Sequence, residues 1–393
     1  MKKILLSAIL ILASISVFAQ NNEANQQLNT AQRLLNSNQG LTIGGYGEVH
    51  YNQPLNSDTY NNGTLDVHRV VMLFGYNFNE RTQFVTELEF EHVSEVYVEQ
   101  AFIQYKINNA INFRGGLMLI PMGIVNEYHE PNTFNGVERP LIDKYISPTT
   151  WREIGAGFTG TVLPASLRYQ AYVVNGFNGY NGAGKFNGKN GLRKGRQKGI
   201  ESYISSPNFT AKVEYFGIRG LNVGLSGYFG DSQSTLYDGI SKNDKDAVAA
   251  ADSSVIGMAM VGLDGRYTNG GLQLRGQYYY SSLSNTKQYN EFTGSDLGSA
   301  LMGYYVEAGY NVFKHLDNVK TDLIPFVRYE KYNTHQKVDN IIQNDAYKKT
   351  AITTGLTWKM TQNAVLKADM LFVKSAADDK YSKVFNAGFG IMF

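Results

Sequence analysis

The sequence predicts an all-β protein, a transmembrane antiparallel β-barrel of about 16 strands with short periplasmic turns and long extracellular loops. Three observations lead to this prediction. Apolar and polar residues alternate from Leu41 onward, tight turns alternate with longer polar connectors, and no apolar run of roughly 18 residues follows the N-terminal segment. The composition agrees, because 27 Tyr, 21 Phe and 40 Gly against 8 Pro are typical of strands joined by glycine-bearing turns.

Residues 1–19 are predicted to be a Sec-type signal peptide. Lys2 and Lys3 form a positively charged start, Ile4–Ile15 is an apolar run, and Ala19 is a small residue where cleavage is expected. The alternative is a membrane anchor, but the apolar run is shorter than the roughly 20 residues that a spanning helix needs. Export combined with a membrane barrel predicts the outer membrane of a Gram-negative bacterium.

Residues 20–40 are rich in Asn and Gln, and we expect a polar leader there, followed by the barrel over 41–393. The last twelve residues, "SKVFNAGFGIMF", show the strand pattern best: alternate residues from Lys383 to Phe393 share a largely apolar face, and the others are mostly small or polar. The same pattern predicts strands at 41–51, 65–78, 81–92, 96–107, 110–120, 151–163, 165–176, 200–217, 220–231, 253–268, 271–283, 300–313, 320–333, 347–360, 362–375 and 382–393.

The connectors between these segments are unequal in length. Short ones such as "NFNE" and "LPA" alternate with mostly longer polar ones, of which 121–150 is the longest. An even number of strands places both termini on the side of the short turns, which is periplasmic in outer-membrane barrels. The barrel must close, because lipid offers no hydrogen-bond partner to an open sheet edge. A secreted β-sandwich or β-helix is the alternative, but it would need less turn asymmetry or a short internal repeat.

The segment from Gly115 to Gly160 carries a resemblance to a known family. Its motifs are Gly116, Pro121-Met122-Gly123, Glu138-Arg139-Pro140, Trp151, Glu153 and Gly155. With these motifs and the layout of the whole chain, the sequence resembles the phosphate-selective porin O/P superfamily, especially its Bacteroidetes-type members. The resemblance implies a general or anion-preferring channel and a homotrimer. The final strand ending in Phe393 is similar to the signal that barrel-assembly machinery reads.

Charged residues recur on the faces that the alternation assigns to the barrel lumen. Basic rings favour anions in pores, and guanidinium groups bind oxyanions. Acidic residues fall on the same faces, so anion selection and a transverse field that orients polar solutes both stay open. The predicted pore-lining residues are Arg69, Arg81, Glu87, Glu89, Lys106, Arg114, Arg168, Arg275, Arg328 and Lys367.

The connector 121–150 is expected to fold into the lumen, as loops at this position do in sixteen-stranded porins, according to the resemblance. Pro131 and Pro140 would stiffen it and Gly136 would let it turn. Its charged residues have two open roles: they line a constriction, or they form salt bridges that fasten the loop to the wall. The candidates are His129, Glu130, Glu138, Arg139 and Arg152.

Several function classes are disfavoured by the sequence. Removing the signal peptide takes two of 36 basic residues and leaves 34 against 34 acidic ones, which argues against nucleic-acid binding. There is no cysteine, and the six histidines have no partner at metal-ligand spacing, so we predict no metal site and no cofactor. No "GxSxG" motif occurs, and a row of carboxylates at Glu87, Glu89 and Glu91 reads as an acidic stripe, so we predict that the protein is not an enzyme.

The predicted function is therefore that of an outer-membrane porin, which lets small hydrophilic solutes, anions among them, diffuse through a charged constriction. The alternative is a plugged structural or adhesive barrel whose external loops bind a partner. Besides solutes, the expected partners are outer-membrane lipid and lipopolysaccharide. Residues 176–199 hold six basic and no acidic residues, and they are either a lipopolysaccharide-phosphate contact or a solvated loop.

Overall fold

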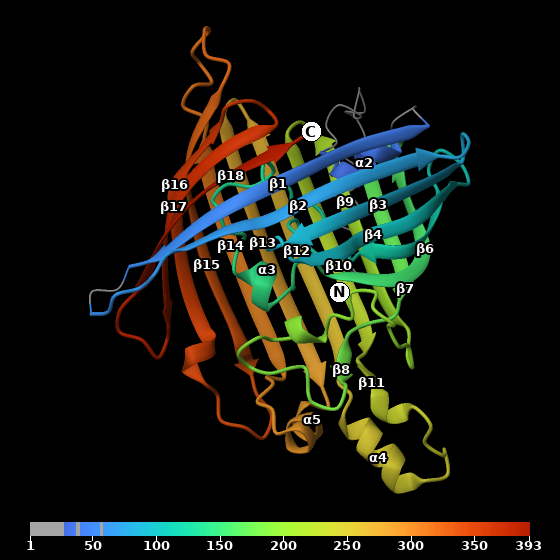
Figure 1. Cartoon of the computed structure of the whole chain (residues 1–393). Coiled ribbons are helices and arrows are strands. Elements are labelled where there is room, and N and C mark those ends of the chain that lie inside the picture. Colours follow the sequence, from blue (N-terminus) through green and yellow to red (C-terminus); the bar gives the residue numbers. More distant parts are fainter. Residues whose placement is uncertain (1–26, 37–39, 56–57) are drawn as a thin grey trace, which may run out of the picture.

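A computed structural model describes residues 27–36, 40–55 and 58–393, so the predicted signal peptide lies outside the described residues. Within them, sixteen strands form one closed antiparallel barrel (Figure 1), which confirms the predicted fold class. The barrel strands are β1 (Leu41–Pro54), β2 (Thr64–Asn77), β3 (Thr82–Glu91), β4 (Glu95–Lys106), β5 (Asn112–Leu119), β6 (Arg152–Val162), β7 (Leu167–Val174), β9 (Asn208–Ile218), β10 (Leu221–Asp231), β12 (Gly257–Asn269), β13 (Leu272–Ser284), β14 (Ala300–Tyr310), β15 (Asp322–Lys337), β16 (Lys348–Lys359), β17 (Ala364–Ser375) and β18 (Ser382–Met392).

The remaining elements belong to the connectors and the leader. A two-stranded parallel sheet joins β8 (Asn178–Tyr180) and β11 (Gln233–Ser234). The helices are α2 (Thr30–Leu35), α3 (Ile142–Tyr145), α4 (Lys245–Ser253) and α5 (Thr286–Thr293), with single 3-10 turns η3 (Leu163–Ala165), η4 (Arg193–Gly195), η5 (Thr235–Tyr237) and η6 (Asp345–Tyr347). No helix in the described ranges combines the length and the apolar content needed to cross a membrane, a finding that does not bear on crossing by strands.

The chain ends close the barrel. Strand β1 pairs with β18, and the carboxyl-terminal Phe393 exchanges two backbone hydrogen bonds with Gly45, at 2.8 and 3.0 Å. Closure removes both sheet edges, and with them the unpaired amides that hydrocarbon surroundings would leave unsatisfied. The short turns and the C-terminus share one rim, whereas α4 and α5 lie on the long connectors at the other rim (Figure 1).

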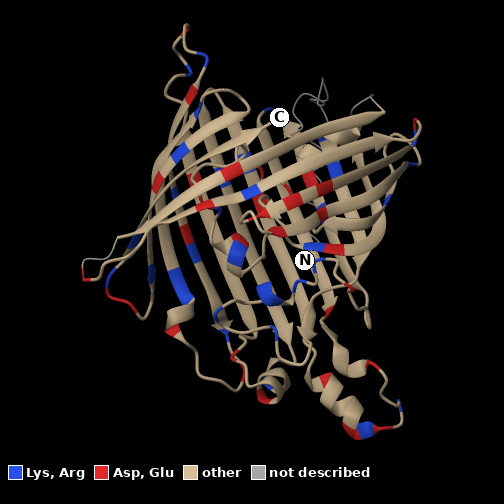
Figure 2. Cartoon of the chain, viewed as in Figure 1, with Lys and Arg blue, Asp and Glu red and all other residues tan. Residues whose placement is uncertain are grey.

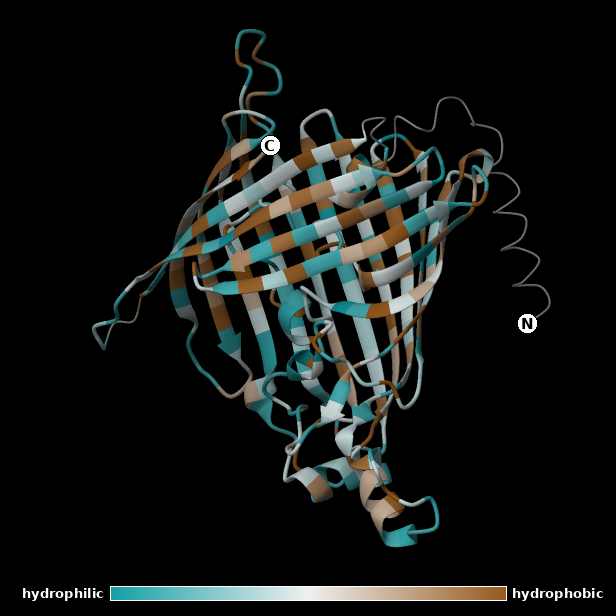
Figure 3. Cartoon of the chain, turned by 45° about the vertical axis from the view of Figure 1, so that its right-hand side comes forward, coloured by the Kyte–Doolittle hydropathy of each residue, from teal (hydrophilic) through white to brown (hydrophobic). Residues whose placement is uncertain are grey.

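The two faces of the wall differ in polarity, as the alternation predicts. Along β7, Arg168, Gln170 and Tyr172 are buried on the inner face, whereas Val173 is exposed on the outer face. Figure 3 shows the same alternation of hydrophilic and hydrophobic residues along the other strands. The outer face therefore presents apolar side chains around the barrel, whereas most charged residues within the strands are buried. Figure 2 marks the positions of these charged residues along the chain.

Two predicted strands begin later than expected. The strand predicted over 200–217 begins at Asn208, directly after Pro207, which has no amide hydrogen to donate to a ladder. The strand predicted over 253–268 begins at Gly257, because α4 extends to Ser253. Alternation alone does not locate these starts, because polar loop residues continue the pattern by chance.

Two β-bulges disturb the alternation near one part of the wall. Glu48 pairs with Arg69 and Val49 with Val67, which leaves His68 as the extra residue. In the same way, Glu87 pairs with Gln100 and Leu88 with Val98, which leaves Glu99 as the extra residue of β4. A bulge changes the direction of the side chains that follow it. As a result Glu99 and Gln100 are both buried, at 0% and 5% exposure, although they are neighbours in sequence.

Part of the predicted leader lies inside the barrel. Helix α2 begins at a capping box, in which the Asn29 side chain accepts from Gln32 N and the Gln32 side chain accepts from Asn29 N. Its partners on the wall are Gln83, whose amide donates to Leu35 O at 2.6 Å, and Arg168, which donates to Gln32 Oε1 at 2.8 Å. The helix therefore occupies lumen space next to β2 and β3.

Candidate constriction site

Residues 120–151, here called the inward loop, connect β5 to β6 and lie inside the barrel. Every residue from Ile120 to Pro131 is buried. Gly123 and Gly136 have φ angles of 66° and 78°, a left-handed backbone that favours glycine. A Cβ on Gly123 would stand 1.7 Å from Tyr279 Oη, so the loop also approaches the wall closely there.

The Asn126 side chain joins the two ends of the inward loop. Its Nδ2 donates to Ile120 O and to Trp151 O, both at 2.8 Å, and its Oδ1 accepts from Trp151 N at 2.9 Å. A single side chain thus satisfies three backbone groups where the chain leaves β5 and enters β6. These three hydrogen bonds close the loop at its base and hold it in a fixed shape.

Trp151 anchors the end of the loop in an aromatic cluster. Its ring packs on Phe177 and Tyr228, with centroids 4.5 and 4.6 Å away. Its Nε1 donates to Glu153 Oε1 at 2.9 Å, and the Tyr228 hydroxyl also donates to this carboxylate. The predicted motif residues Trp151 and Glu153 therefore have a structural role, since one carboxylate orders two aromatic side chains.

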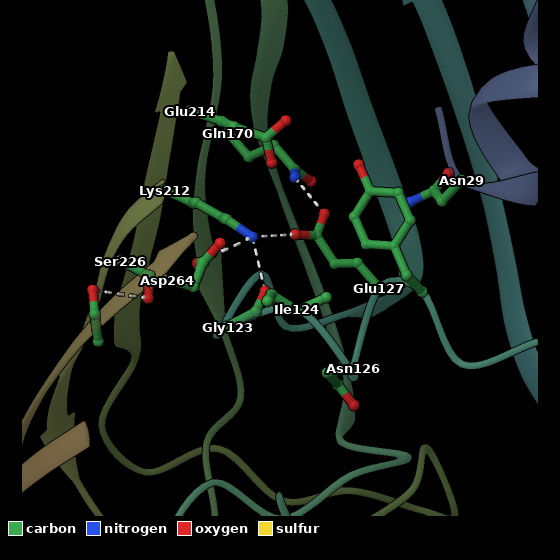
Figure 4. Close-up of polar contacts among 12 residues, drawn as sticks. Asn29, Gly123, Ile124, Asn126, Glu127, Gln170, Lys212, Glu214, Ser226 and Asp264 are labelled. Atoms are coloured by element: carbon green, nitrogen blue, oxygen red, sulfur yellow. Dashed lines mark hydrogen bonds and ion pairs between the residues drawn. The ribbon is translucent and has the colours of Figure 1, made fainter. Parts of the chain in front are cut away.

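Lys212 on β9 fastens the first half of the inward loop (Figure 4). Its Nζ donates to Gly123 O at 2.6 Å and to Glu127 Oε2 at 2.8 Å, and it lies 3.5 Å from Asp264 Oδ2. The other oxygen of Glu127 accepts from Gln170 Nε2. The ammonium thus has two hydrogen-bond acceptors and two carboxylates within ion-pair distance, which is the condition for tolerating a charge at 3% exposure.

The second half of the loop is held by the opposite part of the wall. Val137 N donates to Asp369 Oδ2 at 2.7 Å, and Leu141 N donates to Glu330 Oε2 at 2.6 Å. Arg328 donates to the Glu138 backbone oxygen at 3.1 Å. The loop therefore contacts β9, β15 and β17, and it divides the lumen.

Asp143, in α3 on the same loop, is buried against β13. Tyr279 donates to Oδ1 and Gln277 to Oδ2, each at 2.9 Å. Burial raises the pKa of the Asp143 carboxyl to about 8, although these two hydrogen bonds act to lower it. The group is therefore mainly neutral at pH 7.

The structure separates the five predicted constriction residues by exposure. His129, Glu130 and Arg152 are buried. Glu130 accepts from Thr30 N at 3.2 Å, and His129 Nδ1 donates to Asn126 O at 3.1 Å. The Arg152 guanidinium lies over the Tyr97 ring. Glu138 and Arg139 keep partial exposure. Glu138 Oε1 lies 3.3 Å from His50 Nδ1, and Arg139 donates to His129 O.

The predicted pore-lining residues fall into three groups. Arg69, Arg168 and Arg328 are buried in ion pairs with wall carboxylates, and Glu89 is a partner of Arg69 at 3.1 Å. Arg114, Arg275 and Lys367 have no carboxylate within 4.0 Å in the described part of the chain, and Glu87 is buried. Arg81 and Lys106 are exposed at the rim, where β3 begins and β4 ends, and their place in the pore lining stays a prediction.

Several residues of the site were missed from the sequence. Lys212 and Glu214 alternate with Ala211 and Val213 in β9, so the strand pattern contained the signal for their inward direction. Glu99 had no such signal, because its inward direction depends on the bulge in β4. The structure also brings together two groups with metal-ligating atoms that sequence spacing did not indicate: Asp66, His68 and His92, and Glu87, Glu99 and His129.

Comparison with known proteins identifies a relative by sequence. No family model matches it. A protein of Aquifex aeolicus (strain VF5), described only as uncharacterized, is 31% identical over 375 residues, which are 92% of this chain and 82% of that protein. The chain belongs to the same family as this Aquifex protein.

Several solved structures share the fold of the chain described here, at low sequence identity. The anion-selective porin from Comamonas acidovorans is 12% identical, with a TM-score of 0.57 over 90% of this chain and 99% of that one. Salmonella typhi OmpF, in complex with daunomycin, is 14% identical, with a TM-score of 0.57 over 90% and 97%. The trimer form of Vibrio cholerae OmpT is 13% identical, with a TM-score of 0.51 over 90% and 100%.

Proposed function

We propose that the protein is an outer-membrane porin, in which small hydrophilic solutes diffuse passively past the inward loop. The observation that carries this proposal is a loop folded into a closed sixteen-strand barrel and fastened to its wall by buried charges, as at Lys212 and Glu127. A fixed loop sets the size limit, and the charges beside it bias which ions pass. The shared fold with the anion-selective porin of Comamonas acidovorans supports the same function.

We further propose that the channel prefers anions, as the resemblance to the phosphate-selective porin O/P superfamily implies. Most luminal arginines are neutralised by wall carboxylates, as Arg168 is by Glu214. The preference between anions and cations then depends on basic residues that have no acidic partner in the described ranges. Chief among them is Arg114, whose guanidinium donates to Gln104 and Tyr172. We therefore expect a modest anion preference.

The test is conductance of the purified protein in planar lipid bilayers, for the native chain and for a deletion of residues 124–146. Stepwise ohmic currents are expected from the native chain and larger steps from the deletion, because the loop fills part of the lumen. No current from well-inserted native protein would contradict the channel. Equal step size in both proteins would show that the loop is not the constriction.

A plugged barrel is the second candidate, and one observation favours it. Helix α2 and the inward loop touch each other inside the lumen, through Thr30 and Glu130 and through the Tyr128 hydroxyl, which donates to Gln27 O at 2.7 Å. Helix α2 and the inward loop together leave a smaller open cross-section of the lumen than the inward loop alone would leave. Liposome swelling with small sugars separates the two functions: a plugged barrel gives none, and gains it when residues 20–36 are deleted.

Partners in the envelope are a further part of the proposal. The trimer form of Vibrio cholerae OmpT supports a homotrimer, which light scattering of the detergent-solubilised protein would test. Phe393 is 70% exposed, so its ring is available to barrel-assembly machinery, and truncation at Met392 should reduce insertion into the membrane. Contact with outer-membrane lipid follows from the apolar outer face, and the contact of residues 176–199 with lipopolysaccharide stays a proposal.

A further inference from the structure

We propose that Glu87, Glu99 and His129 bind one divalent transition-metal ion, which links the inward loop to the wall. Glu87 lies on β3, Glu99 on β4 and His129 on the loop. Each residue offers one ligand atom, and these atoms all lie within 4.8 Å of one another. The proposal goes beyond solute diffusion and does not depend on it, because the ion would fasten the loop in a conducting or a plugged barrel alike.

The site is enclosed and its ligand atoms lack other partners. The three residues are 2%, 0% and 3% exposed. Glu87 Oε2, Glu99 Oε1 and His129 Nε2 have no hydrogen-bond partner among the residues that the structure describes. Buried charged groups are ordinarily paired or bound to metal, since an isolated one costs several kcal/mol. The three residues carry unpartnered buried atoms and bring their ligating atoms within 4.8 Å of one another, so they form a donor set that suits a cation.

The orientation of the His129 ring fits a metal ligand. Nδ1 donates to the Asn126 carbonyl at 3.1 Å, which directs Nε2 to the carboxylates, with Glu99 Oε2 at 3.5 Å. Metal-binding histidines commonly donate their second ring nitrogen to a backbone carbonyl in this way. The contact of 3.5 Å between Nε2 and Glu99 Oε2 is longer than an ordinary charge-assisted hydrogen bond, so it leaves Nε2 available as a ligand.

The neighbouring guanidinium groups do not supply that cation. Arg69 lies between Glu48 and Glu89, at 2.8 and 3.1 Å. The Arg152 guanidinium lies over the Tyr97 ring, with its carbon 5.4 Å from the ring centroid. Both guanidinium groups thus make their contacts elsewhere, and among the described residues neither lies within 4.0 Å of a Glu87 or Glu99 oxygen.

The donor set narrows the class of ion. One imidazole and two carboxylates suit Zn²⁺ and the other first-row divalent metals, whereas Ca²⁺ and Mg²⁺ prefer oxygen ligands alone. The bulge in β4 supports a built site, because it adds Glu99 to the inner face where regular pairing would turn it outward. An ion held from β3, β4 and the loop would stiffen the constriction.

The experiment uses the full-length protein purified in detergent, stripped with a chelator and then dialysed against Zn²⁺. We expect one tightly held Zn²⁺ per chain by mass spectrometry of the metal, and a higher Tm with Zn²⁺ than with chelator. Glu99→Gln and His129→Asn should each weaken Zn²⁺ binding at least about a hundredfold and remove the Tm difference, because loss of a ligand costs more than loss of its supporting partner.

The matched control is His68→Asn, which disrupts the other group of ligating residues and should keep both the bound Zn²⁺ and the Tm difference. Native protein that holds no Zn²⁺ and has the same Tm in both buffers would overturn the proposal without any variant. So would binding that survives in Glu99→Gln and His129→Asn, or binding that is lost in His68→Asn. Far-ultraviolet circular dichroism identifies any variant that is not folded, and Glu87→Gln then replaces it.

Discussion

The ammonium of Lys212 on β9 lies 2.8 Å from Glu127 Oε2 on the inward loop, and both side chains are more than nine-tenths buried. The same ammonium binds the Gly123 carbonyl, so one wall residue fixes two points of the loop. Removing one partner of a buried pair leaves an uncompensated charge, which costs about 3–5 kcal/mol. The position of the constriction therefore depends on this contact.

Lys212→Met should lower the free energy of unfolding by about 3–5 kcal/mol, because Glu127 and Asp264 lose their cation. The loop should also leave its position, so that bilayer steps become larger and noisier. Urea titration and single-channel recording measure the two effects. Lys106→Met, at the exposed rim, is the control and should change neither. Native-like channels from Lys212→Met would contradict the fastening role.

Asp143→Asn should reduce the dependence of stability on pH. The unfolded carboxyl has a pKa of about 4, and burial raises the folded value to about 8. The contribution of this group is thus fully present below pH ~4 and is lost as pH rises through ~8, with a slope of at most about 1.4 kcal/mol per pH unit. Unfolding midpoints between pH 4 and 9 test this, with Asp379→Asn, an exposed carboxylate, as the control. An unchanged slope in Asp143→Asn would show that the group is charged in the folded protein.

Trp151→Ala should cost about 3–5 kcal/mol, because it opens a cavity beside Phe177 and Tyr228. Trp151→Phe keeps most of the ring contact and loses the hydrogen bond to Glu153, so we expect a smaller cost of about 1–3 kcal/mol. Urea titration of both variants measures the difference. Equal costs would mean that the Glu153 contact, and not packing, anchors the end of the loop.

Arg114→Ala should shift the reversal potential in a salt gradient toward cations, because it removes a luminal charge that no carboxylate neutralises in the described residues. Arg81→Ala is the matched control, since that arginine lies exposed at the rim. Arg168→Ala should act mainly on stability, because it breaks the buried pair with Glu214. A reversal potential that is the same in Arg114→Ala and in the native protein would remove Arg114 from the selectivity mechanism.

The barrel itself could be predicted because its cause is local. Side chains of a strand alternate between two faces, and in a membrane barrel one face meets lipid. The sequence alone therefore predicts both the strand and the two faces of residues Leu167 to Val174. The later starts at Asn208 and Gly257 were missed, because a loop such as 200–207 has no period that marks where pairing begins. The inward position of residues 121–150 came from a family resemblance and not from the residue pattern.

The pattern of residues alone predicts the layout of about sixteen strands, the apolar outer face and the inward direction of residues such as Arg168 and Arg328, because these follow from a period of two within each strand. Which charges meet depends on how the strands and loops pack in three dimensions. Lys212 and Glu127 are 85 residues apart, and Glu99 turns inward because of a bulge that depends on pairing with β3. Contacts of this kind are set by register and loop path, for which a single strand carries no signal.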